Sequence, residues 1–105
     1  MNIAVLGCGS IGKRHISNFL KLGLDVVAFN RGNKKANEVK KIFKIKTYTN
    51  VKKLFKENKI DLSVICTTGE THIKFSLIAA EFGSNLFIEK PLSNYIQDTK
   101  KLEKI

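Results

Sequence analysis

Short apolar runs rich in β-branched residues alternate along the chain with longer segments in which apolar residues recur every three or four positions. The short runs cover about residues 2–6, 24–30, 46–48, 60–66 and 86–88, and the longer segments about 11–22, 34–44, 50–58 and 71–82. Strands that alternate with helices form βαβ units with parallel strands. The pattern therefore predicts an α/β fold, a doubly wound parallel sheet of strand order 3-2-1-4-5 in one domain.

The ends of the expected helices carry recognisable signals. Gly23 and Gly83 are placed to close the first and fourth helices, and Asn50 to cap the third. A further helix is expected after Pro91. The apolar residues expected on the helices' inner sides are Ile11, Ile16, Phe19, Leu20 and Leu22, then Ala36, Val39, Ile42 and Phe43, then Val51, Leu54 and Phe55, and finally Ile73, Leu77, Ile78 and Ala80.

Size and composition limit the class of protein. A chain of 105 residues with 43% hydrophobic content fits a single core. No apolar run approaches the roughly 18 residues of a membrane span, and the start lacks a secretory signal, so we expect a cytoplasmic protein without a membrane partner. Cys8 and Cys66 have no metal-ligand spacing, so both are expected to be reduced and no metal site is predicted.

The formal charge of +10 raises the question of a nucleic-acid partner. It comes from 19 Lys and Arg against 9 Asp and Glu. The lysines are dispersed at spacings typical of solvated helix faces, arginine occurs only at Arg14 and Arg31, and aromatic residues do not interleave with the basic ones. We therefore expect no nucleic-acid partner, although a basic surface attracts phosphate-bearing ligands.

A Gly-x-Gly-x-x-Gly segment, from Gly7 to Gly12, stands where the first strand passes into the first helix. The second strand ends about twenty residues later, as in the dinucleotide-binding fingerprint. Gly7 permits the tight turn, Gly9 lets the backbone approach a pyrophosphate, and Gly12 lets the helix pack on the strand. We expect the N–H groups of Ser10 and Ile11 to face that diphosphate. A tight turn that binds no ligand is the alternative.

The end of the second strand bears on the choice between NAD and NADP. An NAD-binding domain usually places Asp or Glu here, which accepts hydrogen bonds from the adenosine ribose. This chain has Asn30 and Arg31, and no carboxylate occurs in residues 26–37. Asn30 can hydrogen-bond a 2′-phosphate, Arg31 can pair with it and stack on adenine, and Lys34 and Lys35 add charge. We therefore expect NADP, with NAD second; the alternative is that Asn30 and Arg31 are only turn residues.

Two more motifs lie at the ends of the fourth and fifth strands. They are Thr67-Thr68-Gly69-Glu70-Thr71-His72 and, after a helix and a strand, Glu89-Lys90-Pro91. Together with the glycine loop, these segments resemble the Gfo/Idh/MocA family, which includes glucose-fructose oxidoreductase and inositol dehydrogenases. The resemblance extends to residues 2–12 and 47–61 and so covers almost all of the chain.

The resemblance implies an oxidoreductase that moves a hydride between nicotinamide and a hydroxyl-bearing carbon of a sugar, cyclitol or nucleotide sugar. Lys90 would be the catalytic residue: it would hydrogen-bond the oxygen that becomes alkoxide-like, and burial could lower its pKa enough for proton transfer. Glu89 would orient Lys90 or meet the cofactor, and Pro91 would fix the backbone direction. The alternative for Lys90 is a surface lysine.

The resemblance also assigns cofactor contacts to the loop after the fourth strand. Thr67 would line the region of the nicotinamide ribose together with Thr68, and His72 would open the next helix. The family pattern has Pro and Asn after the threonine, where this chain has Thr68 and Gly69. For His72 a structural role, holding the loop by a hydrogen bond, is at least as strong an interpretation as a catalytic one. His15 is interpreted as structural.

Family members carry a second α/β domain that shapes the substrate pocket, and this chain ends at Ile105, before such a domain. Residues 1–105 are therefore expected to form the dinucleotide-binding domain alone, inactive in isolation. The alternative is a non-catalytic NADP-binding or sensor module. Apolar surface left open where a second domain would pack favours self-association into a homo-oligomer.

Overall fold

The computed structural model describes residues 1–67 and 70–89. Within these residues the strands are β1 (Asn2–Leu6), β2 (Asp25–Phe29), β3 (Thr47–Tyr48), β4 (Leu62–Ile65) and β5 (Asn85–Ile88). The helices are α1 (Ser10–Lys21), α2 (Asn33–Phe43), α3 (Val51–Glu57) and α4 (Glu70–Glu81). Each element lies within a few residues of the range that the apolar pattern predicts. The helix expected after Pro91 lies outside the described residues.

The strands form one parallel sheet in the order β3-β2-β1-β4-β5, which confirms the predicted topology. β1 is the central strand, and Leu6 is in register with Phe29 of β2 and Ile65 of β4. The carboxyl ends of β1, β2 and β4 therefore meet at one edge of the sheet, where ligands bind in doubly wound folds.

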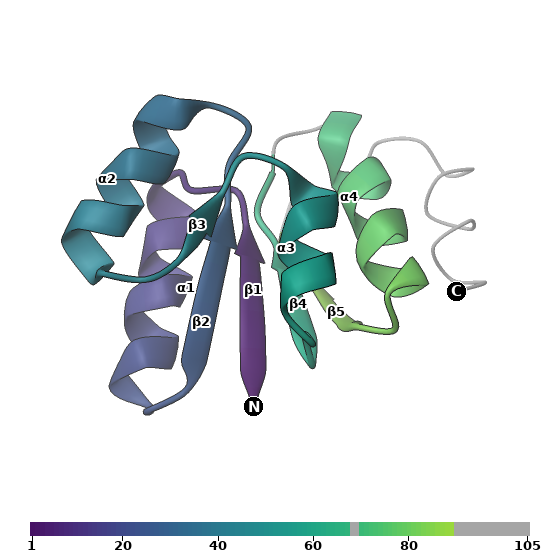
Figure 1. The fold of residues 1–105 in the computed structure, drawn as a ribbon, viewed down its shortest axis with the longest axis horizontal. Helices are drawn as coiled ribbons and strands as arrows, with labels where there is room; N and C mark the ends of the chain where they lie inside the picture. Colours follow the sequence, from purple (N-terminus) through teal and green to yellow (C-terminus); the bar gives the residue numbers. More distant parts are fainter. Residues whose placement is uncertain (68–69, 90–105) are drawn as a thin grey trace.

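Side chains that alternate along β1 build two separate cores. Ala4 and Leu6 belong to a cluster with residues of α3 and α4, whereas Ile3 and Val5 belong to a cluster with residues of α1 and α2. Figure 1 shows the two helix pairs on opposite sides of the sheet. A central strand covered on both faces must be apolar at consecutive positions, which explains the unbroken run in the sequence.

The predicted helix ends are confirmed. Gly23 and Gly83 adopt φ angles of 78° and 80°, in the left-handed region that glycine favours. The Asn50 side chain accepts a hydrogen bond from the Lys53 N–H at 3.1 Å and so caps α3. Lys44 closes α2 in the same left-handed conformation with φ 55°, which the sequence did not signal because the residue carries a Cβ.

Three apolar residues expected on inner helix sides are exposed instead: Ile11, Leu22 and Ile42. Ile11 lies in the first turn of α1, at the open edge of the sheet, and Leu22 follows the last turn. The buried residues of α2 are Ala36 and Val39, and Ile42 is turned away from that line. Helical spacing alone did not separate the ends and flanks of a helix from its packed centre.

None of the helices in the described residues is long and apolar enough to cross a membrane.

Candidate cofactor site

The loop after β1 turns against the end of β4. The Gly7 N–H donates a hydrogen bond to the Phe29 carbonyl at 2.8 Å, and Gly7 has φ 109°. A Cβ at this residue would lie 2.7 Å from the carbonyl carbon and oxygen of Cys66. Both the backbone conformation and the neighbouring strand therefore exclude a side chain at Gly7.

The other two glycines of the loop differ in what surrounds them. A Cβ at Gly12 would lie 1.9 Å from the Gly7 carbonyl oxygen, so α1 packs on the loop with no room for a methyl group. A Cβ at Gly9 would meet no heavy atom within 4 Å. Gly12 thus closes the contact between helix and loop, while Gly9 borders open space in which a ligand can approach the backbone.

The first turn of α1 has amides that make no hydrogen bond within the helix. Its first hydrogen bond runs from the Lys13 N–H to the Gly9 carbonyl at 2.9 Å, so the N–H groups of Ser10 and Ile11 precede it. The N-cap residue Gly9 offers no side-chain acceptor, and the first turn contains no acidic residue. A helix start with free amides and no carboxylate attracts an anion such as a diphosphate.

A cavity of about 190 Å³ lies beside this loop, where β1, β2 and β4 end. Its lining joins segments that are far apart in the sequence, and no carboxylate occurs among its described lining residues. These residues are Gly7, Cys8, Gly9, Asn30, Arg31, Lys35, Cys66, Thr67 and Thr71. The structure therefore brings together five of the predicted cofactor residues. Of the others, Thr68 and Lys90 lie outside the described residues.

Asn30 has a structural task in this cavity that the sequence did not reveal. Its Oδ1 accepts a hydrogen bond from the Cys8 N–H at 3.1 Å, and its Nδ2 donates to the Gly32 carbonyl at 3.1 Å. The side chain thus ties the end of β2 to the glycine loop. The exposed Arg31 and Lys35 are the cationic groups of the lining.

Burial keeps the two thiols of the cavity protonated. It raises the pKa of Cys8 to about 11, against the smaller lowering influence of Lys13 and Lys35. It raises the pKa of Cys66 to about 12, and the charge of Glu89 adds to the effect. Both cysteines are free, as expected. A protonated thiol is a poor nucleophile, so neither group suits covalent chemistry.

Polar atoms are left over at the carboxyl ends of β4 and β5. His72 is 4% exposed; its Nε2 lies 3.1 Å from the Glu89 carbonyl, while its Nδ1 has no hydrogen-bond partner among the described residues. Thr67 is 9% exposed, and its Oγ1 likewise lacks a partner there. A carbonyl only accepts hydrogen bonds, so Nε2 of His72 carries a proton. This bond agrees with the structural interpretation of His72.

His15 reaches this same end of the sheet. Its Nε2 lies 2.6 Å from Oε2 of Glu89, although the two residues are 74 positions apart. The sequence predicts a structural role for His15 but identifies no partner for it. The alternation along β5 is the one signal that could have placed Glu89 on the α1 face.

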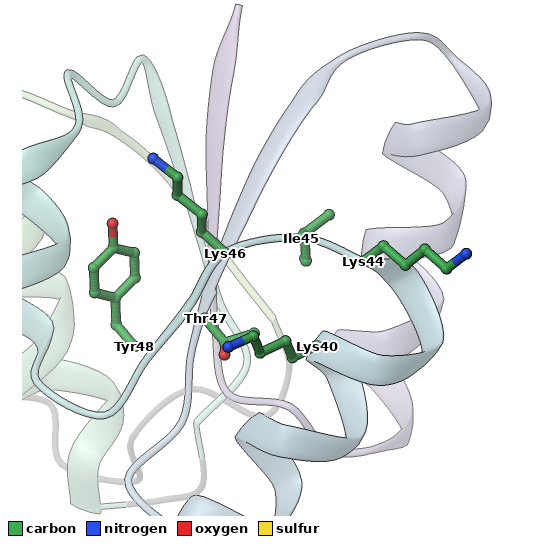
Figure 2. A pocket seen from close by; sticks show the side chains of 6 residues that line it. All are labelled: Lys40, Lys44, Ile45, Lys46, Thr47 and Tyr48. Atoms are coloured by element: carbon green, nitrogen blue, oxygen red, sulfur yellow. The ribbon is translucent and has the colours of Figure 1, made fainter.

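A larger pocket of about 530 Å³ lies at the outer edge of the sheet, along β3. It is lined by Lys40, Lys44, Ile45, Lys46, Thr47 and Tyr48, none of which is a predicted site residue. Figure 2 shows the ammonium groups of its three lysines pointing in different directions. Charges that do not converge suit a solvated edge strand better than a ligand site.

Among the residues that the structure describes, no three His, Cys, Asp or Glu side chains are grouped to hold a metal ion.

Comparisons with known proteins agree with this geometry. Residues 1–105 match the family model GFO_IDH_MocA, described as "Oxidoreductase family, NAD-binding Rossmann fold". The inositol 2-dehydrogenase of Azotobacter vinelandii is 33% identical over 97% of this chain and 32% of its own length. The chain spans about a third of the length of such relatives.

Solved structures show the same fold. Myo-inositol 2-dehydrogenase from Lactobacillus plantarum superposes with a TM-score of 0.88 at 25% identity, over 99% of this chain and 32% of that one. The WlbA dehydrogenase from Bordetella pertussis, solved with NADH and UDP-GlcNAcA, superposes with a TM-score of 0.90 at 20% identity, over 98% of this chain and 32% of that one.

Proposed function

This chain belongs to the Gfo/Idh/MocA family of oxidoreductases as its NAD(P)-binding Rossmann domain, and we propose that it serves a hydride transfer between NADP and a hydroxyl-bearing carbon of a cyclitol, sugar or nucleotide sugar. The relatives named inositol 2-dehydrogenase support the cyclitol part of this substrate class. The observation that carries the proposal is the glycine loop: it leads into the first turn of α1, which has no acidic residue, and its Gly7 and Gly9 line a cavity whose described lining residues include no carboxylate.

The cofactor's diphosphate is proposed to lie over Gly9 and the first turn of α1, where a Cβ would meet nothing and the helix dipole is positive. Its adenosine end would lie at the end of β2. There Arg31 lines both the 190 Å³ cavity and a groove of about 830 Å³ between α3 and α4. A guanidinium in that place can stack on adenine and pair with a 2′-phosphate.

The preference for NADP over NAD rests on Arg31 and Lys35. Both are cationic, both line the cavity, and the nearby Glu38 is paired with Lys13 at 3.1 Å. Structural neighbours were solved with NAD+ or NADH, so the preference for NADP is proposed from the residues of this chain and is not carried over from those structures. Asn30 supports the site by holding the loop, with any phosphate contact coming second to the hydrogen bonds that it already makes.

At the other end of the cofactor, Thr67 and His72 are proposed to border the nicotinamide, and Lys90 to be the catalytic residue. Bound NADP would supply the hydride acceptor. The neutral Lys90 amine would accept the proton of the substrate hydroxyl as the hydride leaves, and the resulting ammonium would hydrogen-bond the carbonyl oxygen that forms. Thr68 and Glu89 complete the proposed cofactor residues.

The compartment and the partners are part of the same proposal. The free thiols of Cys8 and Cys66 suit a reducing compartment, hence the cytoplasm. The partner is proposed to be a small sugar-like molecule. Exposed Phe82 and Phe87 favour self-association, which light scattering would test.

Calorimetric titration of the 105-residue chain with NADP+ and with NAD+ tests the cofactor assignment. We expect NADP+ to bind about tenfold tighter or more. Arg31→Ala should remove most of that preference and leave NAD+ binding nearly unchanged, whereas Arg14→Ala, at an exposed arginine outside the cavity lining, should leave both affinities as they are. Tighter binding of NAD+ by the unaltered chain would overturn the preference.

Turnover separates an enzyme from a sensor module. NADPH formation with a panel of polyols is measured for the full gene product beside the 105-residue chain, together with Lys90→Met in the former. Activity of the gene product that Lys90→Met abolishes supports the proposal. Cofactor binding without turnover in both proteins would favour the non-catalytic alternative.

A further inference from the structure

Three separate elements hold Glu89, the residue directly before Lys90. Its N–H donates to the Ile65 carbonyl of β4 at 3.0 Å. Its own carbonyl accepts from Nε2 of His72, in α4, at 3.1 Å. Its carboxylate Oε2 lies 2.6 Å from Nε2 of His15, in α1. The backbone and the side chain of one residue are therefore fixed from β4, α4 and α1.

The geometry of β5 explains why α1 can reach Glu89. Leu86 and Ile88 pack against the core that includes α3 and α4, so the alternate residues Phe87 and Glu89 face α1. The His15 ring stacks on Phe19 with centroids 6.1 Å apart and meets the edge of Phe87 at 5.8 Å. The two rings hold the imidazole between helix and strand.

Both histidines act as donors toward Glu89. The carbonyl oxygen and the carboxylate are acceptors, so the facing Nε2 atoms must carry protons. The side chains of His15 and Glu89 are only 23% and 26% exposed, so water competes less with their bond than on an open surface. A hydrogen bond to a carboxylate is also stronger and more directional than one between neutral groups.

We propose that His15 and His72 are positioning residues: they fix Glu89 and thereby set the direction in which the backbone continues to Lys90. This inference rests on the proposed role of Lys90. It adds a connection between the two ends of the cofactor site, because α1 both presents the diphosphate amides and holds the corner after β5. Misplacement of a catalytic group by about 1 Å can cost a hundredfold in rate, so such a connection affects turnover.

The 105-residue chain tests the holding directly by NMR. In the unaltered chain, the ring nitrogens of neutral His15 and His72 should show the Nε2–H tautomer. His15→Phe keeps a ring between Phe19 and Phe87 but removes the donor. It should speed hydrogen exchange of the Glu89 amide at least about tenfold and leave the amides of β1 unchanged. Unchanged exchange at Glu89 would overturn the proposed hold.

Kinetics of the full gene product test the positioning. His15→Phe should lower kcat about tenfold or more, with the KM for the cofactor within about twofold of the original. His15→Gln, which restores a donor, should recover part of kcat. Arg14→Ala, at the exposed neighbour on α1, is the matched control and should change neither constant. A merely structural His15 would instead raise KM and lower thermal stability with kcat unchanged.

A double-mutant cycle distinguishes loss of the His15–Glu89 hydrogen bond from a general loss of folding. Glu89→Gln keeps the shape of the side chain and alters the same hydrogen bond, so the double variant H15F/E89Q should be no slower than the slower single variant. Additive losses would overturn the inference. Lys90→Met distinguishes the two levels: full activity there overturns the proposed function and this inference with it, whereas an inactive Lys90→Met beside a fully active His15→Phe overturns the inference alone.

Discussion

The two sides of the sheet's carboxyl edge are held by different kinds of contact. Around β1 and α1, the glycine loop packs through its backbone: Gly12 lies against the Gly7 carbonyl, and Gly7 against Cys66. Around β4, α4 and β5, side chains make the contacts, with His15 and His72 on Glu89. The second side also leaves buried side-chain atoms of Thr67 and His72 without partners among the described residues.

This difference shows how one small domain divides its work. The proposed diphosphate site is made of backbone, and it depends on the absence of side chains from the glycine loop. A side-chain cluster can be retuned one residue at a time, and its unpaired groups suit a ligand that arrives later. We therefore expect substitutions at the closely packed Gly7 and Gly12 to damage both fold and binding, and a substitution at Thr67, whose hydroxyl has no described partner, to affect binding with little loss of stability.

The largest effect is expected from Gly12→Ala. The new Cβ would lie 1.9 Å from the Gly7 oxygen, so α1 must move, and the variant should lose about 3 kcal/mol or more of unfolding free energy. Gly9→Ala is the matched control, because Gly9 has an ordinary φ of −74° and free space for a Cβ. It should keep its stability within about 0.5 kcal/mol.

Urea denaturation and NADP+ titration of both variants separate the two roles of the loop. Gly9→Ala should bind NADP+ at least about tenfold more weakly although it is folded, because the methyl group enters the proposed diphosphate position. Wild-type affinity in Gly9→Ala would contradict that position, and full stability in Gly12→Ala would contradict the close helix contact.

The next effect concerns the two thiols, one on each side of the edge. With the pKa of Cys8 raised to about 11 and that of Cys66 to about 12, alkylation by iodoacetamide at about pH 8 should be a hundredfold or more slower in the folded chain than in urea. Mass spectrometry of the two cysteine peptides measures both rates. NADP+ should slow them further since both residues line the cavity. Equal rates in native and unfolded chain would contradict the burial.

A smaller effect is expected from Thr67→Val. The Thr67 hydroxyl is buried and has no described partner, so its removal should leave the unfolding free energy unchanged or raise it by up to about 1 kcal/mol. Ser63→Ala is the control, because the Ser63 hydroxyl lies 2.7 Å from that of Ser84; its loss should cost about 1 kcal/mol. Cofactor affinity of Thr67→Val should fall about threefold to tenfold. A large loss of stability in Thr67→Val would show that the hydroxyl already has a structural partner.

The smallest effect belongs to the ion pair between α1 and α2. The hydrogen bond from Lys13 lowers the pKa of Glu38 below its ordinary value, so the pair adds stability above that ordinary value and loses it as the pH falls through the lowered one. Glu38→Gln has no such stability to lose. The difference in thermal midpoint between the two proteins should narrow between about pH 6 and pH 3, and it should shrink in high salt. A difference that stays constant with pH would contradict the pairing.

Most of the fold could be predicted from the chain, and the candidate site only in part. The glycine loop, the strand order and the caps at Asn50, Gly23 and Gly83 were foreseen, because each depends on local spacing or on a conformation that few residues adopt. The outward turn of Ile42 and the left-handed Lys44 were missed, because neighbouring elements decide them.

Local sequence determined where the backbone must be bare and where strands and helices begin, since those requirements act over a few residues. It also supplied the absence of a carboxylate near Arg31. Only the tertiary structure decided that Asn30 is occupied by Cys8 and Gly32, and that His15 meets Glu89 across 74 positions. Such contacts depend on how the sheet twists and how its helices pack, and spacing along the chain does not predict them.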